Sequence, residues 1–195
     1  MTKIGILAIQ GDFQAHSQAL TRIGAPFRFV RKASELCGLG GLILPGGEST
    51  TLLKFLQEEE LLEPIRQFAQ SNPVFGTCAG AILMADQVEN PSQPSLELIR
   101  MTVRRNAYGR QLASSIQPIE PEPELDTGPE AGTPLEAVLI RAPVIRQVGP
   151  EVKILARLAS QPVLVRQGLR LAGTFHPELT KDTRVHRYFC QMASS

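Results

Sequence analysis

Cys78 lies between two glycines, in the sequence GTCAG of residues 76–80. Apolar residues precede this segment at 73–75 and follow it at 81–84. A sharp turn from a strand into a helix strains its central residue, and side chains two positions to either side would collide, so glycine suits both flanks. The turn places the thiol at a helix N-terminus, which favours the thiolate, and directs the N–H of Ala79 toward a forming oxyanion. The segment therefore predicts a nucleophile elbow. Taken without other residues, the G-x-C-x-G pattern fits a buried structural cysteine in a glycine-rich turn equally well.

His176 is the candidate proton shuttle for such a thiolate. It ends an apolar stretch and is followed by a proline and Glu178. The proline fixes the backbone, so the glutamate can turn back and accept a hydrogen bond from the imidazole. Together with Cys78, these residues supply a nucleophile, a base and an orienting carboxylate. The other histidines, His16 and His186, have polar neighbours in helical stretches, and we expect them at the surface.

A third segment, residues 44–50 (LPGGEST), places two glycines between an apolar strand and a helix. The backbone N–H groups of such a loop can bind an anion or an oxyanion. The same pattern is also typical of an ordinary tight turn. It lacks the lysine of a nucleotide-binding P-loop, which argues against a nucleotide site.

The elements that position these residues alternate between strand and helix in the first half of the chain. Asp12 is a candidate N-cap for a helix that Gly24 ends. This alternation predicts an α/β, single-domain, three-layer fold with a mostly parallel central sheet. The expected strands are residues 4–9, 27–30, 41–44 and 74–75, and the expected later helices are 49–70 and a stretch from 79.

The second half predicts an antiparallel extension of the sheet, because strand-like stretches follow one another with few helical signals between them. A C-terminal helix over residues 182–192 should dock on the sheet. Residues 117–134 contain five prolines, five acidic residues and no Lys or Arg, so we expect a surface loop without function. The expected strands are 100–103, 137–140, 152–156, 163–166 and 169–175.

Composition excludes several classes of protein. The chain has 195 residues, which is the length of one domain. Its 20 Lys and Arg nearly balance its 19 Asp and Glu, so it carries almost no net charge. Nucleic acids and anionic membranes are bound through an excess of basic residues, so neither is an expected partner. No apolar run reaches the length of a membrane span, and the N-terminal run is too short for a secretory signal. We expect a cytoplasmic protein whose three cysteines stay reduced.

The motifs resemble those of the class I (triad) glutamine amidotransferases, whose fold is flavodoxin-like. A narrower resemblance, to the glutaminase subunit of pyridoxal 5'-phosphate synthase, extends from about residue 4 to the C-terminal helix. It rests on residues 10–11 (QG), 44–51 (LPGGESTT), 76–80 (GTCAG), 105–111 (RNAYGRQ), 140–143 (IRAP) and 175–180 (FHPELT).

The resemblance implies that Cys78 attacks the side-chain amide of L-glutamine, that His176 transfers protons and that Glu178 orients His176. Bound glutamine would lie along Gly47, Glu48 and Ser49, with its amino-acid end held by Arg105, Ile140 and Arg141. Backbone N–H groups of Ala79 and of the turn at Gly46 and Gly47 would form the oxyanion hole.

The resemblance also implies a partner and no metal or organic cofactor. Ammonia would pass to a separate synthase subunit, whose docking would reorder the region near Gln10 and Gly11 and raise a low glutaminase activity. Two features depart from the family pattern: Arg104 replaces a residue that is often acidic, and the 117–134 segment is longer than expected.

Several alternatives stay open from the residues. The glutaminase of another amidotransferase or a DJ-1-like cysteine protein would keep the elbow but lack the paired RNAYGRQ and IRAP motifs. A binding module with a vestigial site would have lost a catalytic residue, whereas Cys78, His176 and Glu178 are all present. A flavodoxin-like cofactor binder would need a phosphate loop after its first strand, and residues 10–13 (QGDF) make a poor one.

Overall fold

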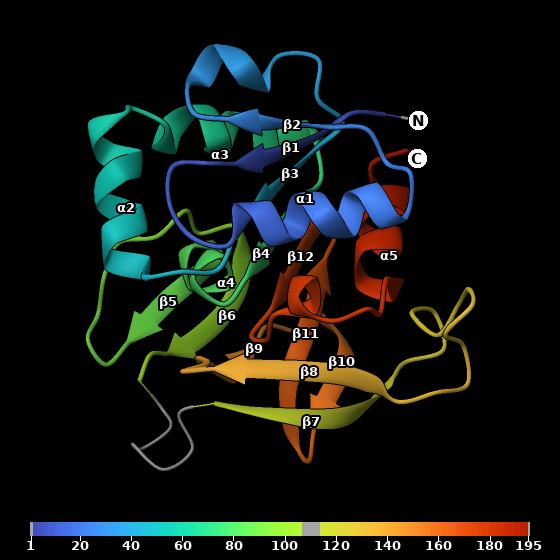
Figure 1. Ribbon diagram of the computed structural model, residues 1–195. Coiled ribbons are helices and arrows are strands. Elements are labelled where there is room, and N and C mark those ends of the chain that lie inside the picture. The colour runs from blue at the N-terminus through green and yellow to red at the C-terminus, as the bar shows by residue number, and fades with distance from the viewer. Residues whose placement is uncertain (1, 107–113, 195) are drawn as a thin grey trace.

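A computed structural model describes residues 2–106 and 114–194 of the chain, and over these residues it contains a nine-stranded sheet (Figure 1). Five neighbouring strands of this sheet are parallel. Three of them, β1, β3 and β4, are buried along their whole length, as expected for apolar strands covered on both faces. In spatial order the parallel strands are β2 (Phe27–Val30), β1 (Ile4–Leu7), β3 (Gly41–Leu44), β4 (Val74–Thr77) and β12 (Arg170–Gly173).

The antiparallel extension predicted from the second half is confirmed. It continues the sheet from β12 through β11 (Gln161–Gln167), β10 (Lys153–Leu158), β7 (Ser114–Pro121) and β8 (Leu135–Ile140). A separate three-stranded sheet, among the described residues, comprises β5 (Ala85–Glu89), β6 (Ile99–Arg104) and β9 (Val144–Val148). Of these three strands, only β6 was predicted.

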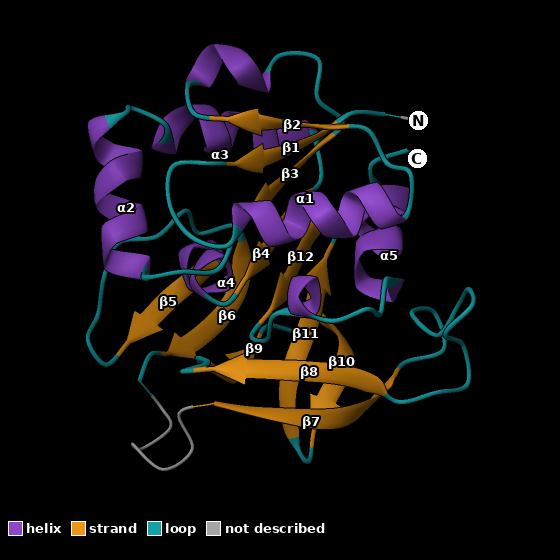
Figure 2. Cartoon of the chain, in the orientation of Figure 1, coloured by secondary structure: helices purple, strands orange, loops and turns teal. Residues whose placement is uncertain are grey.

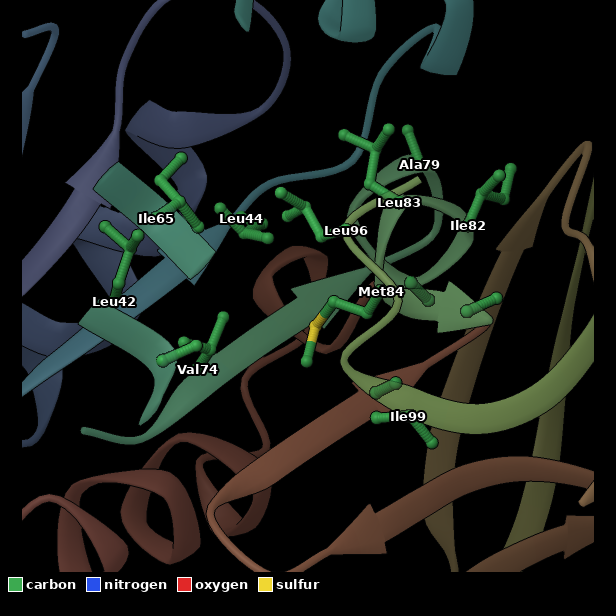
Figure 3. Packing of buried hydrophobic residues seen from close by; sticks show 14 of the residues in the cluster. Leu42, Leu44, Ile65, Val74, Ala79, Ile82, Leu83, Met84, Leu96 and Ile99 are labelled. Atoms are coloured by element: carbon green, nitrogen blue, oxygen red, sulfur yellow. The ribbon is translucent and has the colours of Figure 1, made fainter. Parts of the chain in front are cut away.

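Helices cover both faces of the main sheet, which gives the three layers (Figure 2). One face packs against α2 (Ser49–Glu58), α3 (Leu62–Ser71) and α4 (Ala79–Met84), and the other against α1 (Phe13–Arg22) and α5 (Arg184–Met192). Successive side chains of a strand point to opposite faces of the sheet, and each face has its own hydrophobic core. Leu42 and Leu44 enter the first core, under α2, α3 and α4 (Figure 3), whereas Ile43 enters the second, under α1 and α5. Each fully buried side chain of this size contributes about 1.5–3 kcal/mol, so both layers are firmly fixed.

The single helix predicted over residues 49–70 is wrong, because the chain turns between α2 and α3. Glu60 adopts a φ of 53°, which interrupts the helix, and the N–H of Leu61 donates to Leu56 O. The turn lets Leu56, Leu61 and Ile65 all enter the same core. A straight helix could not keep all of these side chains on the sheet.

The surface loop predicted over residues 117–134 is also partly wrong. Its first residues belong to β7, and Ile119 and Leu125 are buried in the second core. Each proline of β7 has a neighbouring strand on one side only: Pro118 lies where the strand does not pair with β10, and Pro121 lies beyond the residues that pair with β8. Residues 122–134 are held against the start of α5, where Arg184 donates to Asp126 Oδ1 at 2.8 Å and to Thr133 O at 2.8 Å.

The predicted C-terminal helix is confirmed as α5, which begins at Arg184 and packs on the face of the sheet that α1 covers. The first and last described residues lie close together (Figure 1), and Thr2 and Ser194 line the same pocket. Short 3-10 helices occupy Ala33–Leu36 (η1) and Pro177–Leu179 (η3). Among the described residues, no helix combines the length and the apolar character that crossing a lipid bilayer requires.

Candidate active site

Cys78 occupies the sharp turn between β4 and α4, with a φ of 48° and a ψ of −102°. This strained conformation is fixed on both sides. The N–H of Cys78 donates to Gly173 O at 2.8 Å, and a β-carbon on Gly76 would lie only 2.6 Å from the carbonyl carbon of Gly80. A β-carbon on Gly80 would lie 2.0 Å from Leu44 O. The elbow conformation expected from GTCAG is therefore present, for the steric reason that predicted it.

His176 reaches Cys78 because β4 and β12 are parallel neighbours whose carboxyl ends meet at one edge of the sheet. Thr77 is level with Gly173 in this pairing, so the residues just beyond each strand end face the same space. The N–H of His176 donates to Val138 O at 2.8 Å, which anchors the histidine to β8. This edge is where α/β sheets place their ligands.

Glu178 turns back to His176, as the intervening proline suggested. Its Oε1 atom lies 2.8 Å from Nδ1 of His176, and both residues are only 3% exposed. Burial disfavours the imidazolium of His176, but its hydrogen bonds to Cys78 and Glu178 and their charges outweigh burial and raise its pKa to about 10. Burial raises the pKa of Glu178, and the hydrogen bond from His176 opposes that rise. The arrangement favours a histidine that carries a proton beside a thiol.

A cavity of about 210 Å³ opens beside the cysteine. It lies between the elbow, the loop before α2 and the C-terminal end of β8. Eight of the eleven predicted site residues line it: Gly47, Glu48, Ser49, Cys78, Arg105, Ile140, Arg141 and His176. Gly46, Ala79 and Glu178 are not part of its lining. The predicted motif residues 107–111 lie outside the described residues, whereas Asn106 and Pro143 of the same motifs line the cavity.

Two opposite charges lie side by side in the wall of this cavity. Arg105 Nη2 donates to Thr50 Oγ1 at 2.9 Å and lies 3.4 Å from Glu48 Oε1. Glu48 is also the N-cap of α2, where its carboxylate accepts from the backbone N–H groups of Thr50 and Thr51. Burial opposes ionisation of Glu48, but these hydrogen bonds prevail and lower its pKa to about 2. A cation and an anion side by side suit the charged end of an amino acid.

The glycine loop lies close behind the reacting groups. A β-carbon on Gly46 would approach His176 Cε1 to 2.4 Å, and one on Gly47 would lie 2.6 Å from the side-chain nitrogen of Gln10. The carbonyl of Gly46 accepts from the N–H of Asp12 at 3.1 Å. The His176 ring therefore requires a glycine at position 46, and the φ of 150° requires one at position 47. The loop is also linked directly to the segment before α1.

The side chain of Asp12 does not cap α1, which was its predicted role. It occupies the N-cap position of α1, but its side chain makes no capping hydrogen bond. Its Oδ2 atom lies instead 3.6 Å from Nδ1 of His176, and the residue lines the cavity. The proximity depends on folding, since no local pattern links positions 12 and 176.

The prediction that His16 and His186 lie at the surface is wrong, because both are 0% exposed. His16 Nδ1 lies 3.0 Å from His186 Nε2, and His16 Nε2 lies 3.1 Å from Thr77 Oγ1, directly behind the elbow. Burial lowers the pKa of both imidazoles, that of His186 to about 3. A sequence signal did exist: His16 lies four residues before Leu20, on the apolar face of its helix.

Within residues 2–106 and 114–194, one group of side chains has the types and spacing of a metal site: Asp12, His176 and Glu178, with ligand atoms within 4.8 Å of one another. The nitrogen of His176 that lies near both carboxylates is Nδ1, which is already hydrogen-bonded to Glu178. That nitrogen cannot ligate an ion while it makes this bond. The hydrogen-bonded pair accounts for the short distances.

Solved structures define the class of this fold and site. A crystal structure described as a glutamine amidotransferase superposes with a TM-score of 0.90 at 46% identity, over 98% of this chain and 99% of that chain. A putative GMP synthase protein from Thermoplasma acidophilum, at 18% identity, shows the same fold alone, with a TM-score of 0.72 over 100% of this chain and 94% of that chain. The expected amidotransferase fold is thus confirmed.

Comparison of the sequence with known proteins identifies a family within this class. The model of the SNO glutamine amidotransferase family matches residues 6–195, and the chain belongs to this family. Proteins named pyridoxal 5'-phosphate synthase subunit PdxT, from Solibacter usitatus and Koribacter versatilis, are 52% and 53% identical to it. The matches cover 97% of this chain and 98% and 95% of the two relatives. The PdxT of Thermus thermophilus is 48% identical over 97% of each chain.

Proposed function

We propose that this chain is the glutaminase subunit of a pyridoxal 5'-phosphate synthase: it hydrolyses L-glutamine to L-glutamate and ammonia and supplies the ammonia to a separate synthase subunit. One observation carries the proposal. Cys78, held in a strained elbow, shares a cavity with His176, which is hydrogen-bonded to the buried Glu178. The names of the full-length relatives point to the synthase partner.

In the proposed reaction, the thiolate of Cys78 attacks the amide carbonyl carbon of glutamine and forms a tetrahedral oxyanion. The imidazolium of His176 gives its proton to the departing nitrogen, the carbon–nitrogen bond breaks, and ammonia leaves a glutamyl thioester. The neutral imidazole then takes a proton from water, whose oxygen attacks the thioester. Collapse of this second intermediate breaks the carbon–sulfur bond and releases glutamate.

The proposed roles of the other residues follow from their positions. Glu178 orients His176 and stabilises its protonated form. The N–H of Ala79 and a backbone N–H of the Gly46 and Gly47 turn receive the oxyanion. Six of the lining residues hold the substrate: Gly47, Glu48 and Ser49 along its length, and Arg105, Ile140 and Arg141 at its amino-acid end.

Partner dependence is part of the proposal. The hydrogen bond from Asp12 to Gly46 links the segment at Gln10 and Gly11 to the proposed oxyanion turn, so docking near that segment can reorder the turn. We propose the cytoplasm as the compartment, since a catalytic thiol must stay reduced, and all three cysteines are free thiols. No organic cofactor or metal takes part in the proposed hydrolysis.

The test is an ammonia and glutamate assay on the wild-type chain and on Cys78→Ala, each with and without the cognate synthase. We expect full turnover only for the wild type with the synthase, and no turnover for Cys78→Ala, which should stay folded. If Cys78→Ala keeps even about a tenth of the wild-type rate, a loss of less than about 1.4 kcal/mol of transition-state stabilisation, the thiolate mechanism is wrong. Full turnover of the wild-type chain alone would contradict activation by the partner.

A further inference from the structure

His16 connects the proposed triad to the interior of the protein. Its Nε2 atom lies 3.6 Å from Oε1 of Glu178 and 3.1 Å from Oγ1 of Thr77, while its Nδ1 atom lies 3.0 Å from Nε2 of His186. All four side chains are buried, and they come from α1, β4, α5 and the segment after β12. The same carboxylate oxygen of Glu178 thus faces His176 on one side and His16 on the other.

The partners of the two imidazoles select one tautomer of His16. If Nδ1 of His16 carried the proton, His186 would accept it at Nε2 and its own proton would lie on Nδ1, a buried atom with no hydrogen-bond partner among the described residues. The lone pair of His16 Nε2 would then also face the carboxylate oxygen. With the proton on Nε2, His16 donates to Thr77 and presents an N–H dipole to Glu178, and His186 donates to Nδ1 of His16. This second arrangement leaves no buried N–H of the two rings without an acceptor, so it is favoured.

The charges around Glu178 explain why a neutral donor there matters. Burial raises the pKa of Glu178, the hydrogen bond and charge of His176 lower it, and the nearby carboxylate of Asp12 raises it. His16 is itself neutral, because burial and the neighbouring His186 and His176 lower its pKa. The N–H dipole of His16 therefore favours the carboxylate form of Glu178 without adding a second cation beside His176.

We propose that His16 is a positioning residue for glutamine hydrolysis, which holds Glu178 ionised and turned toward His176 through its Nε2–H group. The inference rests on the proposed function, in which Glu178 orients the catalytic histidine. His16 itself does not line the cavity and does not touch the substrate. Its effect must therefore reach the reaction through the carboxylate, which distinguishes it from a residue that only fills the core.

The test compares His16→Leu, which removes both ring nitrogens, with His16→Gln, whose amide N–H can occupy the place of Nε2–H. Glutamine hydrolysis is measured with the synthase present across a range of pH. For His16→Leu we expect kcat to fall about fivefold to tenfold with KM nearly unchanged, since the 3.6 Å contact is weaker than a full hydrogen bond to a charged group. The acidic limb of the profile should move to higher pH, because Glu178 would then protonate more easily. His16→Gln should keep most of the wild-type kcat and leave the acidic limb close to its wild-type position.

Leu20→Ala is the matched control, because Leu20 is buried on the same helix and its side chain has no N–H group to offer Glu178. It should lower the melting temperature without moving the acidic limb. If His16→Leu behaves like this control, with its kcat and acidic limb unchanged, the proposal is overturned. Wild type and Cys78→Ala are assayed alongside, so a failure of the proposed function appears as equal turnover by these two proteins.

A second measurement does not depend on whether the variants fold. Long-range proton–nitrogen NMR spectra of the wild-type chain with labelled histidine report which ring nitrogen of His16 carries the proton. A neutral ring protonated on Nε2 supports the proposal. A ring protonated on Nδ1, or on both nitrogens near neutral pH, overturns it.

Discussion

His176 Nδ1 and Glu178 Oε1 are 2.8 Å apart in a place from which water is almost excluded. In such surroundings a hydrogen bond to a charged group is strong, and leaving either partner alone is costly. The pair also fixes the second ring nitrogen, Nε2, as the one that is free to meet the reacting atoms. Orientation and proton affinity of the histidine therefore both depend on this contact.

Glu178→Gln keeps the shape of the side chain and removes its charge. The pKa of His176 should fall from about 10, because the carboxylate that helps raise it is gone. We expect kcat to drop by about 100-fold or more, in line with the usual contribution of a positioned acid–base group. The alkaline limb of the kcat profile, where His176 loses its proton, should move to lower pH. An unchanged alkaline limb in assays with the synthase would contradict the role of Glu178.

Arg105→Lys keeps the charge beside the cavity but removes the planar fork that can bind a carboxylate in two places. We expect KM for glutamine to rise about tenfold and kcat to change less, because the contact is made in the ground state as well as in the transition state. Steady-state kinetics with the synthase measure both constants. Arg104→Lys is the matched control, since Arg104 is exposed, does not line the cavity and should leave both constants unchanged. Equal effects of the two changes would exclude a specific role for Arg105.

Local patterns predicted the parts of the site that local sterics control. The elbow at Cys78 follows from glycines that have no room for a β-carbon, and the turn from His176 to Glu178 follows from the proline between them. Both signals lie within a few residues of the reacting group. The parallel strands that carry them were predictable as well, because strands covered on both faces are apolar throughout.

Features that depend on distant pairing were not predictable in the same way. The surface assignment of His16 followed from its polar neighbours, whereas its burial results from contacts with Thr77 and His186, far away in the chain. The sequence analysis assigned residues 117–121 of β7 to a loop because of their prolines, each of which pairs with a strand on one side only. Two strands of the small sheet, β5 and β9, also lacked a strong local pattern, since they contain few buried residues.

Glu48→Ala tests the capping role of a residue that also lines the cavity. We expect a loss of about 1 kcal/mol of stability, which lowers the melting temperature by about 2–4 °C for a chain of this size. The pKa of Glu48 is lowered from 4.5 to about 2, so its charged form contributes stability above 4.5, and this contribution is lost as the pH falls toward 2. The difference in melting temperature from wild type should therefore be constant near neutral pH and shrink in acid.

Thermal unfolding followed by circular dichroism at several pH values measures that difference. Lys54→Ala, at an exposed position in the middle of the same helix, is the control and should show little change at any pH. A gap between wild type and Glu48→Ala that stays the same in acid would show that the ionised carboxylate is not the source of the stability.

Arg184→Ala should release the segment 122–134 from α5. The guanidinium of Arg184 is fully buried and binds Asp126 and Asp182, so its removal leaves carboxylates without their partner and should cost about 3–5 kcal/mol in denaturant unfolding. The segment contains Glu122, Glu124 and Glu130 and no Lys or Arg, so a glutamate-specific protease should cut it faster in the variant. Arg146→Ala, which removes an arginine at an exposed position of β9 in the other sheet, is the control. If both variants are cut at the wild-type rate, Arg184 does not hold the segment, and other contacts, such as those of Tyr188 with Glu124 and of Thr183 with Glu130, must order its acidic residues.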